Sequence, residues 1–434
     1  MTQGFYTGLS GIQTHQYGID VVSDNLANVN TIGYRGSNTE FASLLSTKIT
    51  SAGASTPTSN DIEVGVRLQT ASMNTTGGAF LNTDRFNDLA IGGNGWFGVM
   101  SGTKDYFTRA GDFVFDEYQK IPGDGNSSIA RLTTGDGMYV TGTMLGNYAY
   151  NPAAGSFVVS PTNDVPLAAA DAQGPLEFPT LLTYPAQPTT VTKFAANLGF
   201  APETRTMSAD AISANNDRNR VKLVFTQSAV QPSTGVSWDI AATVTSNDGQ
   251  TVYDTQSGQA IFGALGILQT STLPTLNNDG APVTVDLLSY LGGITSSAGV
   301  PITASSQSDG TLGGTLTKYG ISSDGTIIAD FSNGRQSAIG RVAVYHFQNE
   351  QGLDHTSGTL YSQSSNSGKP TFWTDKNGNP TTGATINAGH LENSNVRLDV
   401  GLTDMIILQR AYQANAKTIT TVDEMIQKAL QMRR

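Results

Sequence analysis

The chain has no cysteine, few charged residues and no long apolar run. Without cysteine, disulfide scaffolds, thiol nucleophiles and thiolate metal sites are excluded. No run of about 18 apolar residues is present, so we expect no helix inserted in a membrane. The first residues lack the basic and apolar segments of a secretory leader, and we therefore expect no cleaved signal peptide.

Charge is also scarce, and its sign is uneven. Only 14% of the 434 residues are charged, and the formal net charge is −11. Residues 151–330 hold 14 acidic and 6 basic side chains, which places −8 of that charge in the middle of the chain. An acidic surface argues against nucleic acid as a partner. We interpret the middle as a solvated outer region, within a chain long enough for two to four domains.

The first residues carry a 4-3 repeat, which predicts a helix with one seam along its length. The repeat consists of Phe5, Leu9, Ile12, Gln16, Ile19, Ser23 and Leu26. Gly4, Gly8, Gly11 and Gly18 lie beside it. Each glycine is less favourable in a helix than alanine by about 1 kcal/mol, but each also lets a neighbouring backbone approach closely. This helix needs partners to be stable.

The last residues carry the same repeat over a longer stretch. It consists of Leu398, Leu402, Met405, Gln409, Tyr412, Ala416, Ile419, Asp423, Ile426 and Leu430. A helix of this length, roughly 50 Å at ~1.5 Å per residue, needs another helix to cover its seam, and the N-terminal segment is a candidate. An intramolecular hairpin is one interpretation. We favour a second one, in which both ends are weakly ordered in the monomer and fold on packing with other copies.

The residues between the two ends are typical of β-structure. Segments 221–226, 238–245 and 341–347 are rich in apolar, β-branched and aromatic residues. Asp-Gly and Asn-Gly pairs predict tight turns with positive φ, and they end at Gly95, Gly137, Gly249, Gly280, Gly310, Gly325, Gly334 and Gly378. Short strands punctuated in this way indicate sandwiches or small barrels. The proline-containing stretch 175–188 looks like a connector.

Patterns associated with enzymes are weak, and we expect no enzyme, cofactor or metal site. Residues 93–98 fit a dinucleotide fingerprint, but they continue into a strand where that motif requires a helix N-terminus. Residues 375–380 begin like a calcium loop, yet Pro380 and Ile386 stand where glycine and a bidentate glutamate belong. The histidines show no paired ligand spacing: His15, His346, His355 and His390.

A thirteen-residue string, 23–35, follows the first repeat. We expect the helix to end near Asn28, and Gly33 to supply a positive φ if the turn requires one. This string resembles the N-terminal signature of bacterial flagellar rod and hook proteins. The residues singled out as the signature turn are Asn25, Asn28, Asn30, Thr31, Gly33 and Tyr34.

Further segments resemble the same family in the same order: 89–99 with 106–113, then 340–353, and finally 389–396 running into 407–415. Within this family the rod proteins are short and the hook branch carries inserted β-domains, so the length of this chain favours the hook branch. The resemblance implies a structural subunit that polymerises with copies of itself into the flexible tube between rod and filament. A distal rod protein or minor hook paralogue is an alternative, and a secreted β-rich adhesin is an alternative of another class.

The resemblance also implies partners and a location. The partners would be the distal rod, the hook cap, the hook–filament junction and the flagellar type III export apparatus, which needs no cleaved signal. The location would be the hook of the flagellum, outside the cell. Self-assembly would use the N-terminal residues Phe5, Leu9, Ile12, Ile19 and Leu26, and the C-terminal residues Leu398, Leu402, Met405, Tyr412, Ile419 and Ile426.

Because both ends match one family and the unmatched part is central, we expect the chain to run outward and return. The expected fold is multidomain, α plus mainly β, with terminal helices in a coiled-coil-like region. Three units follow, of which the first two are discontinuous: residues 1–70 with 376–434 as the helical assembly region, 71–150 with 331–375 as an inner β-domain, and 151–330 as an inserted outer β-domain of sandwich or barrel type.

Overall fold

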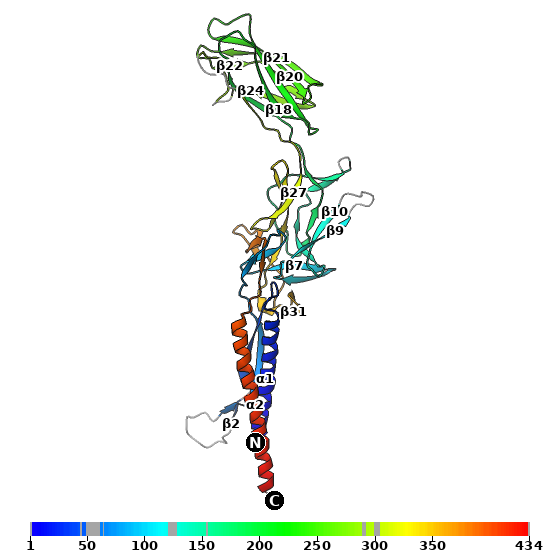
Figure 1. Cartoon of the computed structure of the whole chain (residues 1–434), viewed down its shortest axis with the longest axis vertical. Coiled ribbons are helices and arrows are strands. Elements are labelled where there is room, and N and C mark those ends of the chain that lie inside the picture. Colours follow the sequence, from blue (N-terminus) through cyan, green and yellow to red (C-terminus); the bar gives the residue numbers. More distant parts are fainter. Residues whose placement is uncertain are drawn as a thin grey trace.

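The structure is a computed structural model that describes residues 2–43, 46–48, 61–63, 65–119, 128–152, 155–288, 292–298 and 304–432. Figure 1 shows an elongated molecule, with a helical hairpin at one end and two successive β-regions above it. Both termini lie at the hairpin end of the molecule. The predicted fold class, terminal helices attached to a multidomain and mainly β chain, is confirmed.

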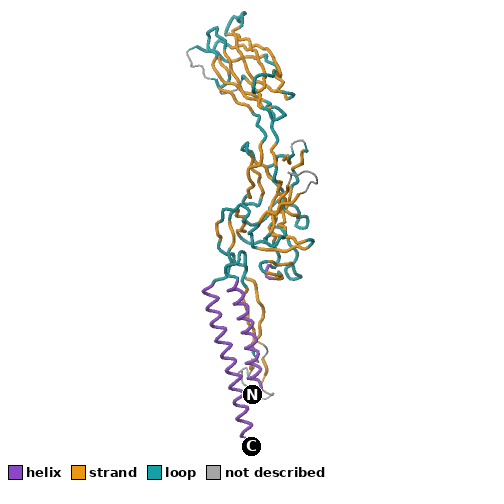
Figure 2. The backbone as a smooth tube through the Cα atoms, turned by 45° about the vertical axis from the view of Figure 1, so that its right-hand side comes forward, coloured by secondary structure: helices purple, strands orange, loops and turns teal. Residues whose placement is uncertain are grey.

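The hairpin consists of α1 (Thr2–Ala27) and α2 (Leu398–Met432), which run antiparallel side by side (Figure 2). On another side, α1 packs against the antiparallel pair β1 (Ser37–Ser43) and β4 (Val66–Met73). A short ladder, β2 (Ser46–Lys48) with β3 (Asp61–Glu63), lies between these two strands in the sequence. Neither helix, over its described residues, is long and apolar enough to cross a membrane.

Short ladders connect the N-terminal and C-terminal parts of the chain just above the hairpin. These ladders are β5 (Phe80–Asn82) with β36 (His390–Glu392), and β6 (Leu89–Gly92) with β35 (Thr385–Ala388). A separate hairpin is formed by β33 (Trp373–Thr374) and β34 (Pro380–Thr381).

The middle region is built on a sheet that contains sixteen strands within the described residues. Ten of its strands precede the outer region in the chain: β7 (Trp96–Ser101), β8 (Lys104–Thr108), β9 (Val114–Gln119), β10 (Ser128–Thr133), β11 (Tyr139–Met144), β12 (Tyr148–Asn151), β13 (Ser156–Val159), β14 (Gly174–Pro175), β15 (Glu177–Pro179) and β16 (Leu182–Tyr184). The others follow it: β27 (Gly314–Ile321), β28 (Thr326–Phe331), β29 (Gln336–Val342), β30 (Val344–Tyr345), β31 (Asp354–Ser357) and β32 (Leu360–Ser362). A 3-10 turn, Glu350–Gly352, precedes β31.

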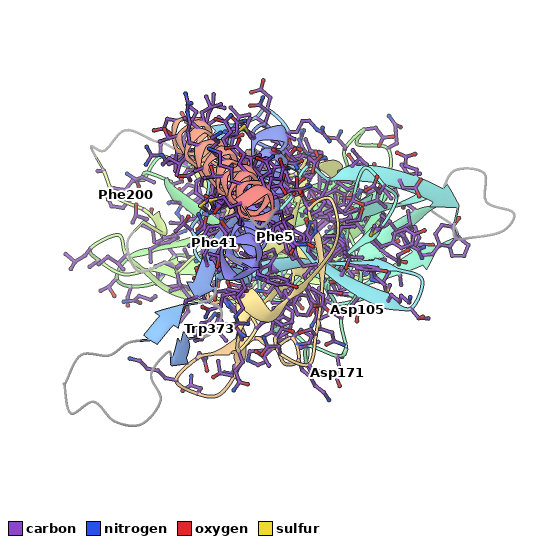
Figure 3. All side chains as sticks on the ribbon, turned by 90° about the horizontal axis from the view of Figure 1, so that it is seen from below. Phe5, Phe41, Asp105, Asp171, Phe200 and Trp373 are labelled. Carbon is purple, nitrogen blue, oxygen red and sulfur yellow. The ribbon has the colours of Figure 1, made fainter. Side chains whose placement is uncertain are left out.

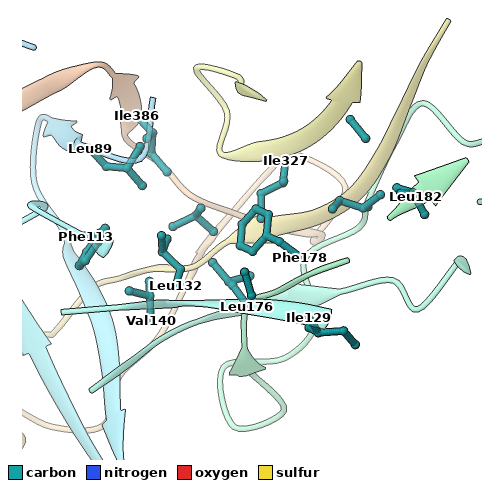
Figure 4. Packing of buried hydrophobic residues seen from close by; sticks show 14 of the residues in the cluster. Leu89, Phe113, Ile129, Leu132, Val140, Leu176, Phe178, Leu182, Ile327 and Ile386 are labelled. Carbon is teal, nitrogen blue, oxygen red and sulfur yellow. The ribbon is translucent and has the colours of Figure 1, made fainter. Parts of the chain in front are cut away.

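One continuous apolar core fills this middle region. Figure 4 shows side chains from both halves of the chain in one cluster, with Leu89 from before the outer region beside Ile386 from after it, and Phe178 beside Ile327. Burial of such side chains stabilises each by roughly 1.5–3 kcal/mol. The core therefore ties the outgoing and returning halves of the chain together.

The outer region consists of two five-stranded sheets over the described residues. One contains β17 (Val191–Asn197), β23 (Leu276–Asn278), β24 (Ala281–Asp286), β25 (Ile294–Thr295) and β26 (Ser305–Ser308). The other contains β18 (Arg205–Ile212), β19 (Arg218–Gln227), β20 (Val236–Ser246), β21 (Val252–Phe262) and β22 (Leu268–Ser271). Buried residues of both sheets share one core that includes Phe194, Phe225 and Trp238. This is a sandwich-type arrangement, as predicted.

The turn chemistry agrees with the sequence. Of the eight glycines named above, seven have positive φ, and Gly310 is the exception. Six of these pairs join the strands of a hairpin: β10–β11, β20–β21, β23–β24, β27–β28, β28–β29 and β33–β34. At Asp279 and Gly280 both residues have positive φ, as a type I′ turn requires.

The strand pairing departs from the expected domain limits. The segments before 187 and after 311 that we assigned to the outer domain, including β13, β16, β27 and β28, pair within the middle sheet. The expected start of the helical assembly region at residue 376 also differs from the structure. β35 and β36 follow this residue and pair with strands of the N-terminal half, and α2 begins only at Leu398. These limits came from where sequence motifs end, and a strand need not match a motif to pair with a neighbour.

The proline-containing stretch 175–188 is likewise not a simple connector. It contains β15 and β16, and its side chains Leu176, Phe178 and Leu182 are buried in the middle core. The two crossings to the outer region lie at Gln187 and Thr311, whose backbone amides and carbonyls pair at 2.9 Å in both directions. The outgoing and returning strands are therefore adjacent.

This adjacency predicts that the outer region can be removed. Replacing residues 188–310 by a short Gly-Ser turn should leave the middle core folded, because the two cut ends are already paired. Deleting 161–309 should unfold it, since this deletion removes Leu176, Phe178 and Leu182 from the core. Circular dichroism and thermal melting of the two variants measure the difference, and equal loss of folding in both would contradict the insertion.

Candidate functional site

The face of α1 turned toward α2 is formed by its glycines. A Cβ placed on Gly8 would lie 2.8 Å from the side chain of Ile419, and one on Gly11 would lie 2.6 Å from that of Asn415. At the other end of the hairpin the roles reverse, because a Cβ on Gly401 would lie 2.6 Å from Leu26. The two helices are close because one side of each contact has no side chain.

The same face continues along the whole of α1. A Cβ on Gly4 would lie 3.4 Å from Val422, and one on Gly18 would lie 3.1 Å from Leu408. The four glycines thus occupy positions of a 4-3 repeat that lies one residue before the predicted apolar seam, and His15 occupies the position between Gly11 and Gly18. The sequence-based expectation that these glycines permit close backbone approach is consistent with these distances, and the backbone approached is that of the same chain.

The predicted seam of α1 is therefore rotated away from α2 by about 100°, one residue of helix. Phe5 is 41% exposed and Leu9 is 37% exposed. Ile12 and Ile19 are half-buried, and Leu26 alone has a described contact with α2, at Gly401. Most of this seam does not form the hairpin contact.

The predicted seam of α2 is divided in the same way. Ile419 packs on Gly8, and Met405 and Ile426 are half-buried. Leu398 and Leu402 are 51% and 46% exposed, and Tyr412 lies at the edge with 36%. The interface instead uses Leu408, Asn415 and Val422, which lie one residue before seam positions.

A surface rich in apolar side chains remains on the hairpin. We call this set the open hairpin surface: Phe5, Tyr6, Leu9, Tyr17, Leu398, Val400, Leu402, Ile406, Ile407, Met425, Leu430 and Met432, all at least 37% exposed. Figure 3, seen from the hairpin end, places Phe5 near the centre of the projection and Phe200 and Asp171 toward its edge. Exposed apolar side chains in this number along one element are typical of an interaction surface.

The signature turn follows α1 and folds as expected. The helix ends at Ala27, and Gly33 has φ of +68°. The Asn25 amide donates to the carbonyl of Ser37 at 2.8 Å, and its oxygen accepts from the Ser37 amide at 2.9 Å. The Asn28 side chain donates to Asp24 O at 3.0 Å and accepts from the Thr31 hydroxyl at 3.1 Å.

One more signature residue, Tyr34, holds the turn against the helix. The Tyr34 hydroxyl donates to Asp24 Oδ2 at 2.9 Å, and burial together with this carboxylate raises the pKa of Tyr34. Asn30 is exposed. The turn therefore acts mainly through local hydrogen bonds that direct the chain from α1 into β1.

The turn also meets the last segment before α2 at a buried ion cluster. Glu392 Oε1 lies 2.8 Å from Nη2 of Arg35, and Oε2 lies 3.2 Å from Nη1 of Arg109. The Gly78 amide donates to Oε1 at 2.8 Å, and the Gly33 amide donates to the Glu392 carbonyl at 2.7 Å. All three charged side chains are about 2% exposed.

The two arginines also bond to backbone. Arg109 donates to the carbonyls of Ile91 at 3.2 Å and Gly93 at 2.6 Å, and Arg35 donates to the carbonyl of Thr76. Burial and the nearby Arg35 lower the pKa of Arg109 to about 10, so it remains charged at neutral pH. Neutral carbonyl oxygens thus help to solvate a cluster with one more positive than negative charge.

A second set of contacts joins the same segments. Asn395 Oδ1 accepts from the Gly36 amide at 2.8 Å, and its side-chain amide donates to the carbonyls of Asn74 and Thr76, each at 2.9 Å. Arg35, Arg109, Glu392 and Asn395 all stand inside the strings that carried the family resemblance, but sequence reasoning gave them no role. No local spacing in the sequence brings them together, because Arg35 and Glu392 lie 357 positions apart.

No catalytic or metal arrangement is found among the residues that the structure describes. There, no group of three or more His, Asp or Glu side chains lies close enough to hold a metal ion. The fingerprint-like residues 93–98 lead into the strand β7, and Asp375 Oδ1 accepts from the amides of Asn377 and Asn379 at 2.8 Å in a tight turn.

Comparison with known proteins gives matches at both ends and over the full length. Residues 5–35 match the family described as flagella basal body rod protein, and residues 387–432 match flagellar basal body rod FlgEFG protein C-terminal. The chain is 30% identical to flagellar hook protein FlgE of Borreliella burgdorferi and 30% identical to that of Treponema pallidum, with 100% of both chains covered in each case. A crystal structure of Helicobacter pylori flagellar hook protein FlgE2 aligns with 72% of this chain and 100% of its own, at 15% identity and a TM-score of 0.47.

The glycine face predicts that a side chain at Gly11 opens the hairpin. Gly11→Val would place two methyl groups where Asn415 lies, whereas Gln13→Val introduces the same residue at an exposed position of α1. We expect the first variant to lose about 1–3 kcal/mol, as overpacking usually costs, and the second to lose much less. Hydrogen exchange of the α1 amides measures this, and equal protection in both variants would refute the close contact.

The ion cluster predicts a larger effect for Glu392→Gln. This change leaves two arginines buried without a counter-charge, and breaking a buried pair typically costs about 3–5 kcal/mol. Chemical denaturation and hydrogen exchange of the Gly33 and Gly78 amides report on it directly. Glu40→Gln, on the exposed side of β1, is the matched control, and a cluster variant as stable as this control would show that the charges contribute little.

Proposed function

Because this chain belongs to the family of flagellar hook proteins, we propose that it is the structural subunit of a bacterial flagellar hook and polymerises with its own copies through the terminal helices. A subunit of this kind is not an enzyme. The observation that carries the mode of assembly is the open hairpin surface, where twelve apolar side chains of α1 and α2 are exposed in the single chain. When another copy covers these side chains, their apolar surface is removed from water, and this burial stabilises the assembly.

The division of each helix into two faces supports this assignment. The glycine face of α1 is used within the chain, so the apolar seam beside it stays available to other copies. Phe5, Leu9, Leu398 and Leu402 are the seam residues assigned to contacts between copies, while Ile419 acts within the chain. The hairpin thus serves as the inner wall of a tube, and the β-regions lie outside it.

The β-regions complete the proposed subunit. The inner β-domain comprises the middle sheet, and the outer β-domain extends from about residue 187 to about residue 311. The pairing of Gln187 with Thr311 leaves one narrow connection between them, visible in Figure 1, so the outer domain can shift as the tube bends.

We also assign partners and a location beyond self-assembly. The ends of the tube contact other flagellar axial proteins, namely the distal rod, the hook cap and the hook–filament junction. The chain leaves the cell through the flagellar type III export apparatus, and its hook lies outside the cell. The lack of cysteine fits passage as an unfolded chain, since no disulfide has to form or break.

The assembly surface predicts a phenotype without loss of folding. Leu402→Asp combined with Ile406→Asp changes two residues that are 46% and 60% exposed, so the monomer should keep its hairpin. Each carboxylate left unpaired in a contact between copies costs several kcal/mol. We expect cells with this variant as their single copy to build rods but neither hooks nor filaments, as seen by electron microscopy of hook–basal bodies.

The control is Val230→Asp, at a residue of the outer domain that is 82% exposed. It should leave hooks and motility unchanged. Normal hooks in the double variant would refute the assigned surface, and normal hooks after deletion of the whole gene would refute the function itself.

A further inference from the structure

A pocket of about 710 Å³ lies in the middle region. Its walls are the turn before β7, the segment that follows β30 and the segment that leads into β33. The volume is within the range of about 300–1,000 Å³ that is usual for small-molecule sites. No lining residue belongs to the open hairpin surface or to the ion cluster, so the pocket has no part in the contacts described above.

The pocket contains the one exposed tryptophan of the chain. The sequence has three tryptophans, of which Trp96 is 1% exposed and Trp238 is fully buried. Trp373 lines the pocket and is 53% exposed. An indole ring that stays in contact with water at the wall of a pocket is typical of a group that binds a ligand.

The ring of Trp373 is held in one orientation. Gly383 lies directly against it with φ of +61°, and a Cβ at this position would overlap with the indole ring. The ring of His346 meets the indole edge to face, with ring centroids 4.8 Å apart. His346 is itself fixed, because its backbone pairs with that of Thr371 at 2.8 and 2.9 Å and its side chain is 9% exposed. The stacking surface is therefore preorganised.

Polar side chains of different character line the same pocket. Glu350 Oε1 lies 3.8 Å from Nδ1 of His346, beyond hydrogen-bond reach. Within the described part of the chain, the side chains of Asn94, Gln348 and Lys369 make no hydrogen bond or ion pair. A carboxylate accepts, an ammonium group donates, and amides do both. The pocket can thus satisfy a ligand that carries both donors and acceptors.

Charge and backbone pairing select the class of ligand. The charges of Glu350 and Lys369 cancel, so the pocket favours neither an anion nor a cation. An extended peptide needs unpaired backbone groups, but the backbone of His346 is paired with that of Thr371, and β33 is paired with β34. A sugar ring presents an apolar C–H face that stacks on an indole, and its hydroxyl groups both donate and accept.

We propose that this pocket binds a neutral saccharide, with one sugar ring stacked on Trp373. The hydroxyl groups of the sugar bond to the carboxylate of Glu350, the ammonium group of Lys369 and the side-chain amides of Asn94 and Gln348. This inference goes beyond the proposed function, because it adds glycan binding to a structural subunit. It does not depend on how the terminal helices pack.

Tryptophan fluorescence of the full chain tests the site directly. Acrylamide in the solvent quenches exposed indoles, and of the three tryptophans only Trp373 is exposed. The probes are a panel of neutral mono- and trisaccharides of glucose, galactose, mannose and N-acetylglucosamine, with mannitol as a control that has hydroxyl groups but no ring. We expect at least one saccharide to reduce the quenching, and mannitol to have no effect.

The range of concentration decides the outcome. Protection by no saccharide up to about 50 mM, well above the Kd of about 1 mM that marks weak binding, would overturn the proposal. The same holds if Trp373 is protected on polymerisation while no saccharide binds, because the pocket then belongs to a contact between copies.

Isothermal titration calorimetry with the saccharide that binds locates the contact. Trp373→Ala should raise Kd at least tenfold, and Gln348→Ala about two- to tenfold, the range for loss of one hydrogen bond. Phe200→Ala, at an exposed aromatic residue of the outer domain, and Gln363→Ala, at an exposed glutamine outside this pocket, are the matched controls and should leave Kd unchanged.

Thermal melting checks that each variant is folded. Since Gln348 is exposed, its variant keeps the test valid even where loss of Trp373 loosens the β33–β34 hairpin. Kd values equal to that of the unsubstituted chain in both pocket variants would overturn the assigned site.

Discussion

The carboxylate of Glu392 holds the two ends of this chain in one place. It accepts from Arg35, which follows α1, and from Arg109, which follows β8, and it does so 2% exposed. Such a cluster is costly to bury and tolerates few alternative geometries. Glu392 lies six residues before α2, so the cluster sets where α2 begins relative to α1. This start determines which large side chains of α2 lie opposite the glycines of α1. The short ladders β5–β36 and β6–β35 reinforce the same junction.

Glycine has an unusual part in this hairpin. Four glycines in α1 weaken the helix by about 1 kcal/mol each, which tertiary contacts must offset. The glycines themselves permit these contacts, because the absence of their side chains lets four residues of α2 pack against the α1 backbone: Val422, Ile419, Asn415 and Leu408. Using the smallest side chains for the internal contact leaves larger apolar ones on the outside. The same helix can therefore have a partner within the chain and present a second face to other copies.

Much of this arrangement was predictable from the sequence, because its signals are local. The 4-3 repeats predicted both helices, and the Asp-Gly and Asn-Gly pairs predicted turns that join six hairpins. The signature string predicted a helix end near Asn28, one residue from the observed end at Ala27, and a glycine at position 33 for a positive φ. The face used within the hairpin was not predictable by the same rule. The glycines of α1 and the apolar seam one residue after them have the same 4-3 spacing. Apolar character favoured the seam, whereas the contact within the hairpin uses the glycines. The ion cluster joins residues 357 positions apart, a separation that no periodicity reports. The limits near 151 and 330 failed because strands outside any motif still complete the middle sheet.

The pairing of Gln187 with Thr311 has a consequence for how such chains diverge. Everything between these residues leaves and rejoins the middle sheet at one point. Closing a longer loop at a fixed pair of ends costs little more free energy, roughly 0.6 kcal/mol for each doubling of its length. Sequence between the two residues is therefore free to lengthen, shorten or be exchanged for another fold over evolutionary time, while the spacing of the two helices stays constant. The same point is a natural graft site for displaying a foreign domain at regular intervals on a polymer.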